Sequence, residues 1–287
     1  EGQDMTIMDA IKKGMIELKN SNIESPKLKS RLLMQYVLKQ TRQYIIVNDL
    51  NQISKEDEER YFVGISKLRA GVPLEHITHQ REFMKLNFYI NENVLIPRQD
   101  TEILVEEVIN IAKRIKNPKI LDLCTGSGAI AVSLAKYLTE SEITATDISN
   151  KALEIAKKNA KINEVENRIT FISSDLFTNI PEEKYDIIVS NPPYIKRNVI
   201  ETLDEQVRKE PYMALDGGLD GLDFYRKIIK NSYEYLKYHG FLCLEIGFDQ
   251  KIDVIELIEN VEKFENTYSK KDLFDNDRII VTQLNLR

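Results

Sequence analysis

Residues 5–69 carry the spacing of amphipathic helices. Apolar residues recur there at steps of three and four, which places them on one face of a helix. Ser25-Pro26 marks a helix start, because proline fits the first turn, where its missing N–H is not needed. Ser54 followed by Asp57 resembles a capping box with a shortened acid. These signals predict a small helical bundle at the N-terminus.

A segment of different character follows the helices. Gly71-Val72-Pro73 breaks the helical pattern, residues 83–90 partly alternate, and Asn91-Glu92-Asn93 is turn-like before the apolar residues 94–96. We predict a β-hairpin with its turn at residues 91–93; a long loop is the alternative. The expected organisation is a helical domain, a linker and a second domain, at residues 1–75, 76–97 and 98–287.

From Thr101 onward, apolar strand-like runs alternate with helical patterns, which predicts a parallel α/β sheet. The expected helices cover residues 102–114, 128–137, 150–161, 222–236 and 252–258. The expected strands cover residues 119–124, 142–147, 168–173, 185–190, 240–246, 264–268 and 278–284. Since the last two strands are adjacent in sequence, we expect an antiparallel hairpin to close the sheet.

Composition narrows the classes of function. The 287 residues carry a net charge of −6, and residues 1–75 hold twelve basic and eleven acidic side chains. This balance argues against a protein that coats nucleic acid, because such proteins are basic. No apolar run approaches the roughly 20 residues that cross a bilayer, and no signal peptide is evident. The chain begins without Met, and we interpret Glu1–Asp4 as preceding a native start at Met5 or Met8.

Metal and disulfide chemistry are not indicated. Cys124 and Cys243 are the only cysteines, and the three histidines do not give a zinc-ligand spacing. His76 and His79 are interpreted as solvated or domain-contact residues. We therefore expect a metal-free, cytoplasmic, globular monomer without membrane contact.

A strand, a glycine turn and a helix start occupy residues 121–131. Gly126 and Gly128 allow a tight turn and a close approach of backbone to a ligand. Asp147 ends the next strand 21 residues after Gly126, the distance at which an acid reaches ribose hydroxyls. The combination predicts an adenine-ribose ligand, with NAD still possible. The alternatives are a simple βα turn and an Asp147 that caps the helix near Asn150.

Asn191-Pro192-Pro193-Tyr194 follows the apolar strand that ends at Ser190. The prolines lack N–H donors and have fixed φ, so their carbonyls are rigid acceptors. The Asn191 carboxamide adds an acceptor, and Tyr194 adds a flat aromatic face. Together they form a clamp for a planar –NH2 group of an amide or an exocyclic amine. The alternative is a strand-ending turn.

With these motifs in place, the chain resembles the S-adenosylmethionine-dependent amino methyltransferases. The likeness narrows to the peptide chain release factor glutamine N5-methyltransferases through three further segments. These are Arg81-Glu82-Phe83, residues 95–102, and the stretch from Glu210-Pro211 to Gly221-Leu222. The resemblance implies a Rossmann-like class I methyltransferase sheet with an N-terminal helical bundle and a hairpin linker. It also implies methylation of the Gln side-chain amide in the Gly-Gly-Gln motif of release factors.

The resemblance and the motifs together assign the candidate site. The predicted catalytic residues are Asn191, Pro192, Pro193 and Tyr194. The predicted S-adenosylmethionine-binding residues are Asp122, Cys124, Thr125, Gly126, Ser127, Gly128, Asp147, Leu176 and Asn191. The chain departs from the family pattern at Cys124, Gln99 and His79, and Leu176 falls where some members place a Trp near adenine.

Several roles stay open at this level. Asp122 binds the glycine turn or faces the methionine amino group, and a mixed role is favoured. Arg98 and Glu102 are read as an interdomain ion pair, with a substrate role as the alternative. Glu245 is the best spare carboxylate. Rival functions are a glutamine methyltransferase of a ribosomal protein, an adenine-N6 DNA methyltransferase, and a non-catalytic nucleotide-binding module. The DNA enzyme would need a basic groove for an extruded base, which the charge distribution disfavours.

Overall fold

The computed structural model describes residues 4–285. The chain divides into two compact units. One holds the residues up to His79 together with Asp204–Lys209, and the other holds Gln80–Leu203 and Glu210 onward. The two units are described separately below.

The first unit is a helical bundle, as the periodicity predicted. Its helices are α1 (Ile7–Asn20), α2 (Pro26–Leu38), α3 (Arg42–Val47), α4 (Lys55–Arg69) and α5 (Leu74–Thr78). Leu18, Leu33, Met34 and Ile65 are buried at its centre, and the buried Tyr61 hydroxyl donates to the Ser30 carbonyl at 3.1 Å. The apolar stripes of α1, α2 and α4 therefore meet in one core.

The helix starts follow the expected capping signals with one shift. Helix α2 begins at Pro26, as predicted. Ser54 Oγ accepts the Asp57 N–H at 3.1 Å. The reciprocal capping box instead starts α1, where Thr6 and Asp9 bond each other's backbone.

The linker forms a hairpin, but its predicted turn is wrong. Strands β1 (Gln80–Phe83) and β2 (Leu86–Tyr89) pair antiparallel around Met84 and Lys85. Both turn residues have positive φ, at 50° and 59°, as two-residue hairpin turns need to match the strand twist. Glycine or asparagine at these positions would have predicted such a turn, and neither residue type is present there. Residues 94–96 do not form a strand.

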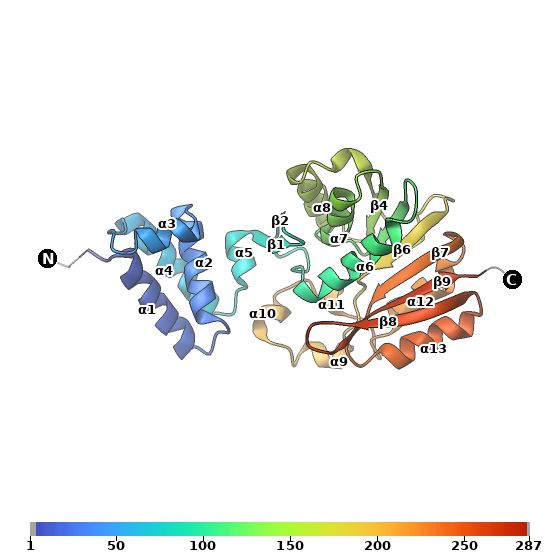
Figure 1. The fold of residues 1–287 in the computed structure, drawn as a ribbon. Helices are drawn as coiled ribbons and strands as arrows, with labels where there is room; N and C mark the ends of the chain where they lie inside the picture. The colour runs from blue at the N-terminus through green and yellow to red at the C-terminus, as the bar shows by residue number, and fades with distance from the viewer. Residues whose placement is uncertain (1–3, 286–287) are drawn as a thin grey trace. The chain divides into compact units, whose positions relative to one another are not determined.

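The second unit contains the expected α/β sheet (Figure 1). Its strands are β3 (Lys119–Leu123), β4 (Glu142–Asp147), β5 (Ile169–Ser173), β6 (Tyr185–Ser190), β7 (Leu236–Glu245), β8 (Phe264–Lys271) and β9 (Asp277–Leu284). They lie in the order β5-β4-β3-β6-β7-β9-β8. The first five are parallel, while β9 runs antiparallel to both β7 and β8. The predicted antiparallel closing hairpin is confirmed.

Helices cover both faces of this sheet. One apolar cluster joins the sheet to α6 (Glu102–Ala112), α7 (Ala129–Tyr137) and α8 (Asn150–Ile162). The cluster on the other face includes α12 (Asp223–Ser232) and α13 (Lys251–Val261). Helix α12 ends earlier than predicted, because β7 already begins at Leu236. The sequence did not predict α9 (Arg197–Ile200), α10 (Glu205–Arg208), α11 (Tyr212–Leu215), η1 (Gln99–Thr101) and η2 (Glu166–Arg168).

Residues 4–285 lack two further features. No helix in this range is long and apolar enough to cross a membrane. The same range contains no group of three His, Cys, Asp or Glu side chains arranged to hold a metal ion.

Candidate functional site

A cavity of about 520 Å³ opens at the carboxyl ends of the parallel strands. Parallel α/β sheets bind ligands at this edge. The lining residues come from the linker and from the segments that follow the parallel strands β3, β4, β5 and β6. They are Glu92, Asn93, Val94, Leu95, Cys124, Gly126, Asp147, Ile148, Ser149, Ala152, Ser174, Asp175, Leu176, Asn191, Pro193, Pro211, Met213, Ala214 and Phe224.

Strand register brings the two sequence motifs together. Leu123 on β3 pairs with Ser190 on β6, and the Ser190 hydroxyl donates to the Leu123 carbonyl at 2.7 Å. The residues that follow these strand ends, Cys124 and Asn191, both line the cavity. The glycine turn and the tetrapeptide therefore begin side by side, although 67 residues separate Leu123 from Ser190.

The two glycines of the turn serve different purposes. Gly126 has a φ of 55°, and a Cβ built on it would meet nothing within 4 Å. Gly128 has a φ of 81°, and its Cβ would lie 3.0 Å from the Ala156 Cβ on α8. Gly126 thus keeps the loop open toward the cavity, whereas Gly128 allows the start of α7 to pack closely on α8.

Asp147 is fixed by the backbone around it. One carboxylate oxygen accepts the Gly126 N–H and the other accepts the Ser149 N–H, both at 2.9 Å. Burial raises the pKa of Asp147. The alternative that Asp147 caps the next helix is wrong, because the Ser149 hydroxyl accepts the Ala152 N–H at the start of α8. Asp147 instead joins the glycine turn to the end of β4.

Asp122 is fully buried behind the glycine turn. Its Oδ2 accepts the Thr125 hydroxyl at 2.7 Å, so contact with the turn is present. Its Oδ1 has no hydrogen-bond partner among residues 4–285. Burial raises the pKa of Asp122 to about 7. A buried acceptor without a donor is costly and marks a place where a ligand N–H would be favourable.

The tetrapeptide is supported by a loop far along the chain. The Ile195 N–H donates to the Leu215 carbonyl at 3.1 Å, and the Gly217 N–H donates back to the Ile195 carbonyl at 2.9 Å. A Cβ on Gly217 would lie 2.7 Å from the Tyr194 Cα, so only glycine allows this approach. The Asn191 carboxamide lines the cavity and makes no hydrogen bond within the described residues. Its acceptor and donors are therefore available to a ligand.

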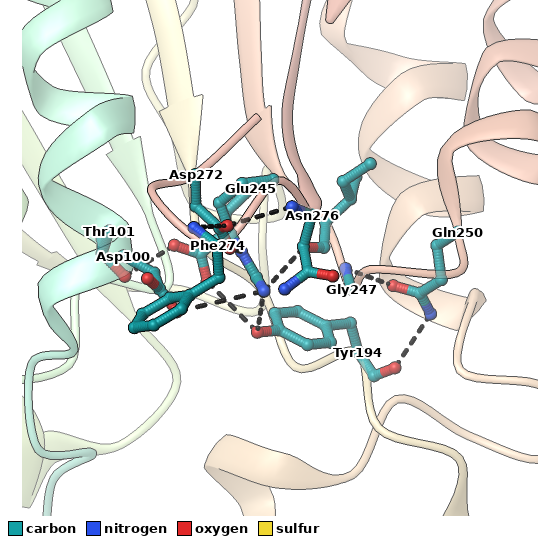
Figure 2. Close-up of polar contacts among 11 residues, drawn as sticks. Asp100, Thr101, Tyr194, Glu245, Gly247, Gln250, Asp272, Phe274 and Asn276 are labelled. Atoms are coloured by element: carbon teal, nitrogen blue, oxygen red, sulfur yellow. Dashed lines mark hydrogen bonds and ion pairs between the residues drawn. The ribbon is translucent and has the colours of Figure 1, made fainter. Parts of the chain in front are cut away.

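The hydroxyl of Tyr194 lies in a polar cluster (Figure 2), and Tyr194 is not among the residues that line the cavity. Its hydroxyl donates to Glu245 Oε2 at 3.3 Å, and its carbonyl accepts from Gln250 Nε2 at 2.9 Å. Glu245, the spare carboxylate of the sequence, is thus a partner of Tyr194. Burial raises the pKa of Glu245 to about 7.

The expected ion pair between Arg98 and Glu102 is wrong. Arg98 pairs with Glu210, whose Oε1 accepts from Arg98 Nη1 at 3.1 Å and from the Ile96 N–H at 2.6 Å. This buried carboxylate fastens the linker segment to the loop at Pro211, and both segments line the cavity. Periodicity could not have paired residues 112 positions apart.

The predicted site residues therefore divide into two sets. The cavity lining contains Cys124, Gly126, Asp147, Leu176, Asn191 and Pro193. It does not contain Asp122, Thr125, Ser127, Gly128, Pro192 and Tyr194. Sequence reasoning missed Ser174 and Asp175, although they follow directly after β5. Inspecting the end of every predicted parallel strand would have found them.

Comparisons with known proteins agree over nearly the whole chain. Two family models match, the Methyltransferase small domain over residues 99–210 and the PrmC N-terminal domain over residues 9–78. A release factor glutamine methyltransferase of Clostridium acetobutylicum is 40% identical over 280 residues, which cover 96% of this chain and 98% of that protein. A protein of the same name from Clostridium botulinum is 41% identical over 279 residues, again covering 96% and 98%.

Solved structures share the fold at low sequence identity. The hMettl16 catalytic domain gives a TM-score of 0.57 at 16% identity, covering 78% of this chain and 82% of that one. A ribosomal protein L11 methylase from Lactobacillus delbrueckii gives 0.50 at 17% identity, covering 69% and 84%. The predicted Rossmann-like class I methyltransferase sheet is confirmed.

Proposed function

Since the chain belongs to the family of release factor glutamine methyltransferases, we propose that it methylates N5 of the glutamine in the Gly-Gly-Gln motif of a release factor. It is an S-adenosylmethionine-dependent glutamine methyltransferase. The observation that carries the finer proposal is the unengaged Asn191 carboxamide, which lies on the cavity beside the glycine turn.

The cavity suits S-adenosylmethionine. Its volume of about 520 Å³ lies within the range of small-molecule sites. Asp147 would accept the ribose hydroxyls, and the apolar Leu176 and Ile148 would pack against the adenine. Oδ1 of Asp122, which has no partner among residues 4–285, would accept from the methionine amino group. A Cβ on Gly126 would meet nothing, so the turn leaves space for the ligand.

The tetrapeptide would orient the substrate amide. The bound cofactor supplies an electrophilic methyl group on a sulfonium. The Asn191 side-chain oxygen would accept one N–H of the glutamine amide, and the Pro192 carbonyl would accept the other. Both contacts fix an amide nitrogen whose lone pair is delocalised, so positioning is the main catalytic effect. The carbonyl dipole also favours the positive charge that develops on that nitrogen, and the excess proton leaves to water.

The helical unit would dock the release factor. A glutamine amide is small, so contacts remote from the reacting group must supply most of the binding. Helix α3 and the residues after it expose Ile46, Val47 and Leu50, which are 60%, 79% and 70% accessible. An exposed apolar group of this kind is typical of a protein contact. We assign residues 1–75 to substrate recognition by a monomeric enzyme, in the cytoplasm, where release factors act.

The decisive experiment follows methyl transfer to defined substrates. Purified enzyme, S-adenosylmethionine and a release factor are incubated, and the Gly-Gly-Gln peptide is examined by mass spectrometry. One methyl group on the glutamine is expected, and a release factor with Asn in place of that Gln should stay unmodified. Radiolabel on DNA or on a ribosomal protein, with an unmodified release factor in the parallel reaction, would contradict the proposal.

The docking assignment has its own test. Val47→Glu places a charge on the exposed apolar group and should raise KM for the release factor while leaving cofactor affinity unchanged. Val63→Glu on α4, at a residue that is 56% exposed, is the matched control. Equal KM values for Val47→Glu and wild type would exclude this group from docking.

A further inference from the structure

Glu245 is a buried carboxylate that the proposed chemistry does not use. It ends β7, is 3% exposed and does not line the cavity. Thr101 donates its hydroxyl to Oε1 at 2.6 Å, and Tyr194 donates its hydroxyl to Oε2 at 3.3 Å. The Tyr225 hydroxyl donates to the Glu245 carbonyl at 2.7 Å. Each carboxylate oxygen thus has one donor, and the backbone of Glu245 is held as well.

Arg278, on the neighbouring strand β9, contacts the same tyrosine hydroxyl. Its Nη1 donates to Tyr194 Oη at 3.4 Å and to the Ile246 carbonyl at 3.2 Å. Its Nε donates to Asp272 at 3.1 Å. Three acceptors on different segments therefore fix the guanidinium. The hydroxyl of Tyr194 therefore donates a hydrogen bond to the Glu245 carboxylate and accepts one from the Arg278 guanidinium.

Asp272 extends the cluster to the turn between β8 and β9. Its side chain is 1% exposed, and Oδ1 accepts the N–H groups of Phe274 and Asn276 at 2.9 and 3.1 Å. Because Asp272 also accepts from Arg278, the turn and the guanidinium hold each other in place (Figure 2).

The other end of Tyr194 is fixed too. Gln250 is 5% exposed, donates Nε2 to the Tyr194 carbonyl at 2.9 Å and accepts the Gly247 N–H at 2.8 Å. The hydroxyl of Tyr194 is thus bonded to the last residue of β7, and its carbonyl is bonded to Gln250 shortly after that strand. A buried carboxylate is costly, and apolar side chains would fill the same space at lower cost. The cluster consequently calls for a role beyond stability.

We propose that Glu245 and Arg278 are positioning residues that hold the Tyr194 ring where it contacts the substrate amide. This inference rests on the proposed function of residues 191–194. The two hydrogen bonds anchor the outer end of the ring, so they limit its rotation about the Cα–Cβ bond and its displacement along the clamp. Positioning of a reacting group affects the transition state more than cofactor binding. The residues therefore act on kcat through Tyr194.

A double-mutant cycle tests whether the effect passes through the hydroxyl. Tyr194→Phe and Glu245→Gln should each lower kcat roughly tenfold, the size of coupling found between contacting residues. The affinity for S-adenosylmethionine should stay within about twofold of wild type. The double variant should be no slower than the slower single variant. Losses in kcat that multiply in the double variant would overturn the proposal, because Glu245 would then act independently of Tyr194.

A second buried acid, which contacts strand β8 of the same sheet, provides the control. Glu107 on α6 accepts the Tyr268 hydroxyl at 2.7 Å and pairs with Lys270, in a Glu–Tyr–cation arrangement away from the cavity lining. Glu107→Gln should lower thermal stability but leave kcat unchanged. If Glu107→Gln lowers kcat as much as Glu245→Gln, general destabilisation explains both results and the positioning role is wrong.

Ring position can also be measured without turnover. In protein labelled with carbon-13 at the tyrosine ζ position, the Tyr194 resonance is assigned by its loss in Tyr194→Phe. It should shift in Glu245→Gln and Arg278→Lys and remain in place in Glu107→Gln. An unmoved resonance in both cluster variants would contradict the proposal. If wild type transfers no methyl to a release factor, the proposed function fails, and this measurement still decides whether the cluster positions the ring.

Discussion

Two segments at one edge of the sheet are built in different ways. The glycine turn at residues 124–128 depends on the positive φ of its own glycines, on Asp122 three residues earlier, and on Asp147 and Asn159 from the next strand and helix. The segment 191–194 is held from outside by Gly217, Gln250 and Glu245. The partners of the turn lie 3 to 32 positions away in sequence, whereas these supports of Tyr194 lie 23 to 56 positions away.

The two segments should respond to mutation in different ways. Changes that disturb the cofactor side should cluster around the turn and Asp147. Changes that disturb methyl transfer should be scattered along the chain, because the supports of Tyr194 come from several strands and loops. Cofactor affinity and transfer rate can therefore be separated by mutation.

The largest separation is expected at Asn191. Asn191→Ala removes the proposed acceptor for the substrate amide and should lower kcat by roughly 10³-fold, as loss of a single preorganised polar group does in other enzymes. Cofactor affinity should change little. Single-turnover transfer to the release factor measures the loss, with the surface variant Asn231→Ala as control. A rate within a few-fold of wild type would show that Asn191 does not hold the amide.

A pH effect on stability should come next in size. Burial raises the pKa of Glu245 to about 7, above the ordinary value of 4.5. A raised carboxyl pKa gives stability that is present in acid and is lost as pH rises toward the folded-state value. Wild type should lose on the order of 3 kcal/mol relative to Glu245→Gln between pH 4 and about 8. Urea unfolding across this range measures the difference, and parallel curves for the two proteins would contradict it.

Asp147 should affect the cofactor side selectively. Asp147→Ala removes the proposed ribose acceptor and the partner of the Gly126 N–H, and should weaken S-adenosylmethionine binding by about 2 kcal/mol. Asp147→Asn retains one acceptor oxygen and should lose less. Calorimetry gives both values, and wild-type affinity in Asp147→Ala would remove the ribose assignment.

Two glycine variants give the smallest effects and the most direct contrast. Gly126→Ala meets no atom but places a side chain at a φ of 55°, which should cost about 1 kcal/mol in cofactor affinity or stability. Gly217→Ala would press on the Tyr194 backbone at 2.7 Å. It should slow transfer about tenfold, since misplacement of catalytic groups is costly. If Gly217→Ala weakened only cofactor binding and Gly126→Ala slowed only methyl transfer, the proposed difference between the two segments would be wrong.

Local patterns were sufficient for much of the fold. Alternating apolar runs predicted all seven strands of the sheet, and Pro26 and Ser54 marked helix starts that the structure retains. Patterns were insufficient for the linker, where the turn at Met84 and Lys85 carries no glycine and was placed too late. A positive φ at such residues is imposed by the pairing of β1 with β2 and by the packing of Phe83 on Phe88, and the two turn residues themselves give no signal of it.

The candidate site divides along the same line. The glycines, the prolines, Asn191 and the strand-ending Asp147 could be identified from the sequence. Each has a backbone conformation or a hydrogen-bonding group that few residue types provide. The partners that decide their arrangement are ordinary residues. Glu210, and not Glu102, forms the ion pair with Arg98. Ser149, and not Asp147, caps helix α8. Glu245 accepts the hydroxyl of Tyr194. The Ser149 cap is a local contact, three residues from Ala152, but Arg98 and Glu210, and likewise Tyr194 and Glu245, are far apart in sequence. Hydrogen bonds and ion pairs depend on distance in space, and only the tertiary fold brings these distant groups within reach.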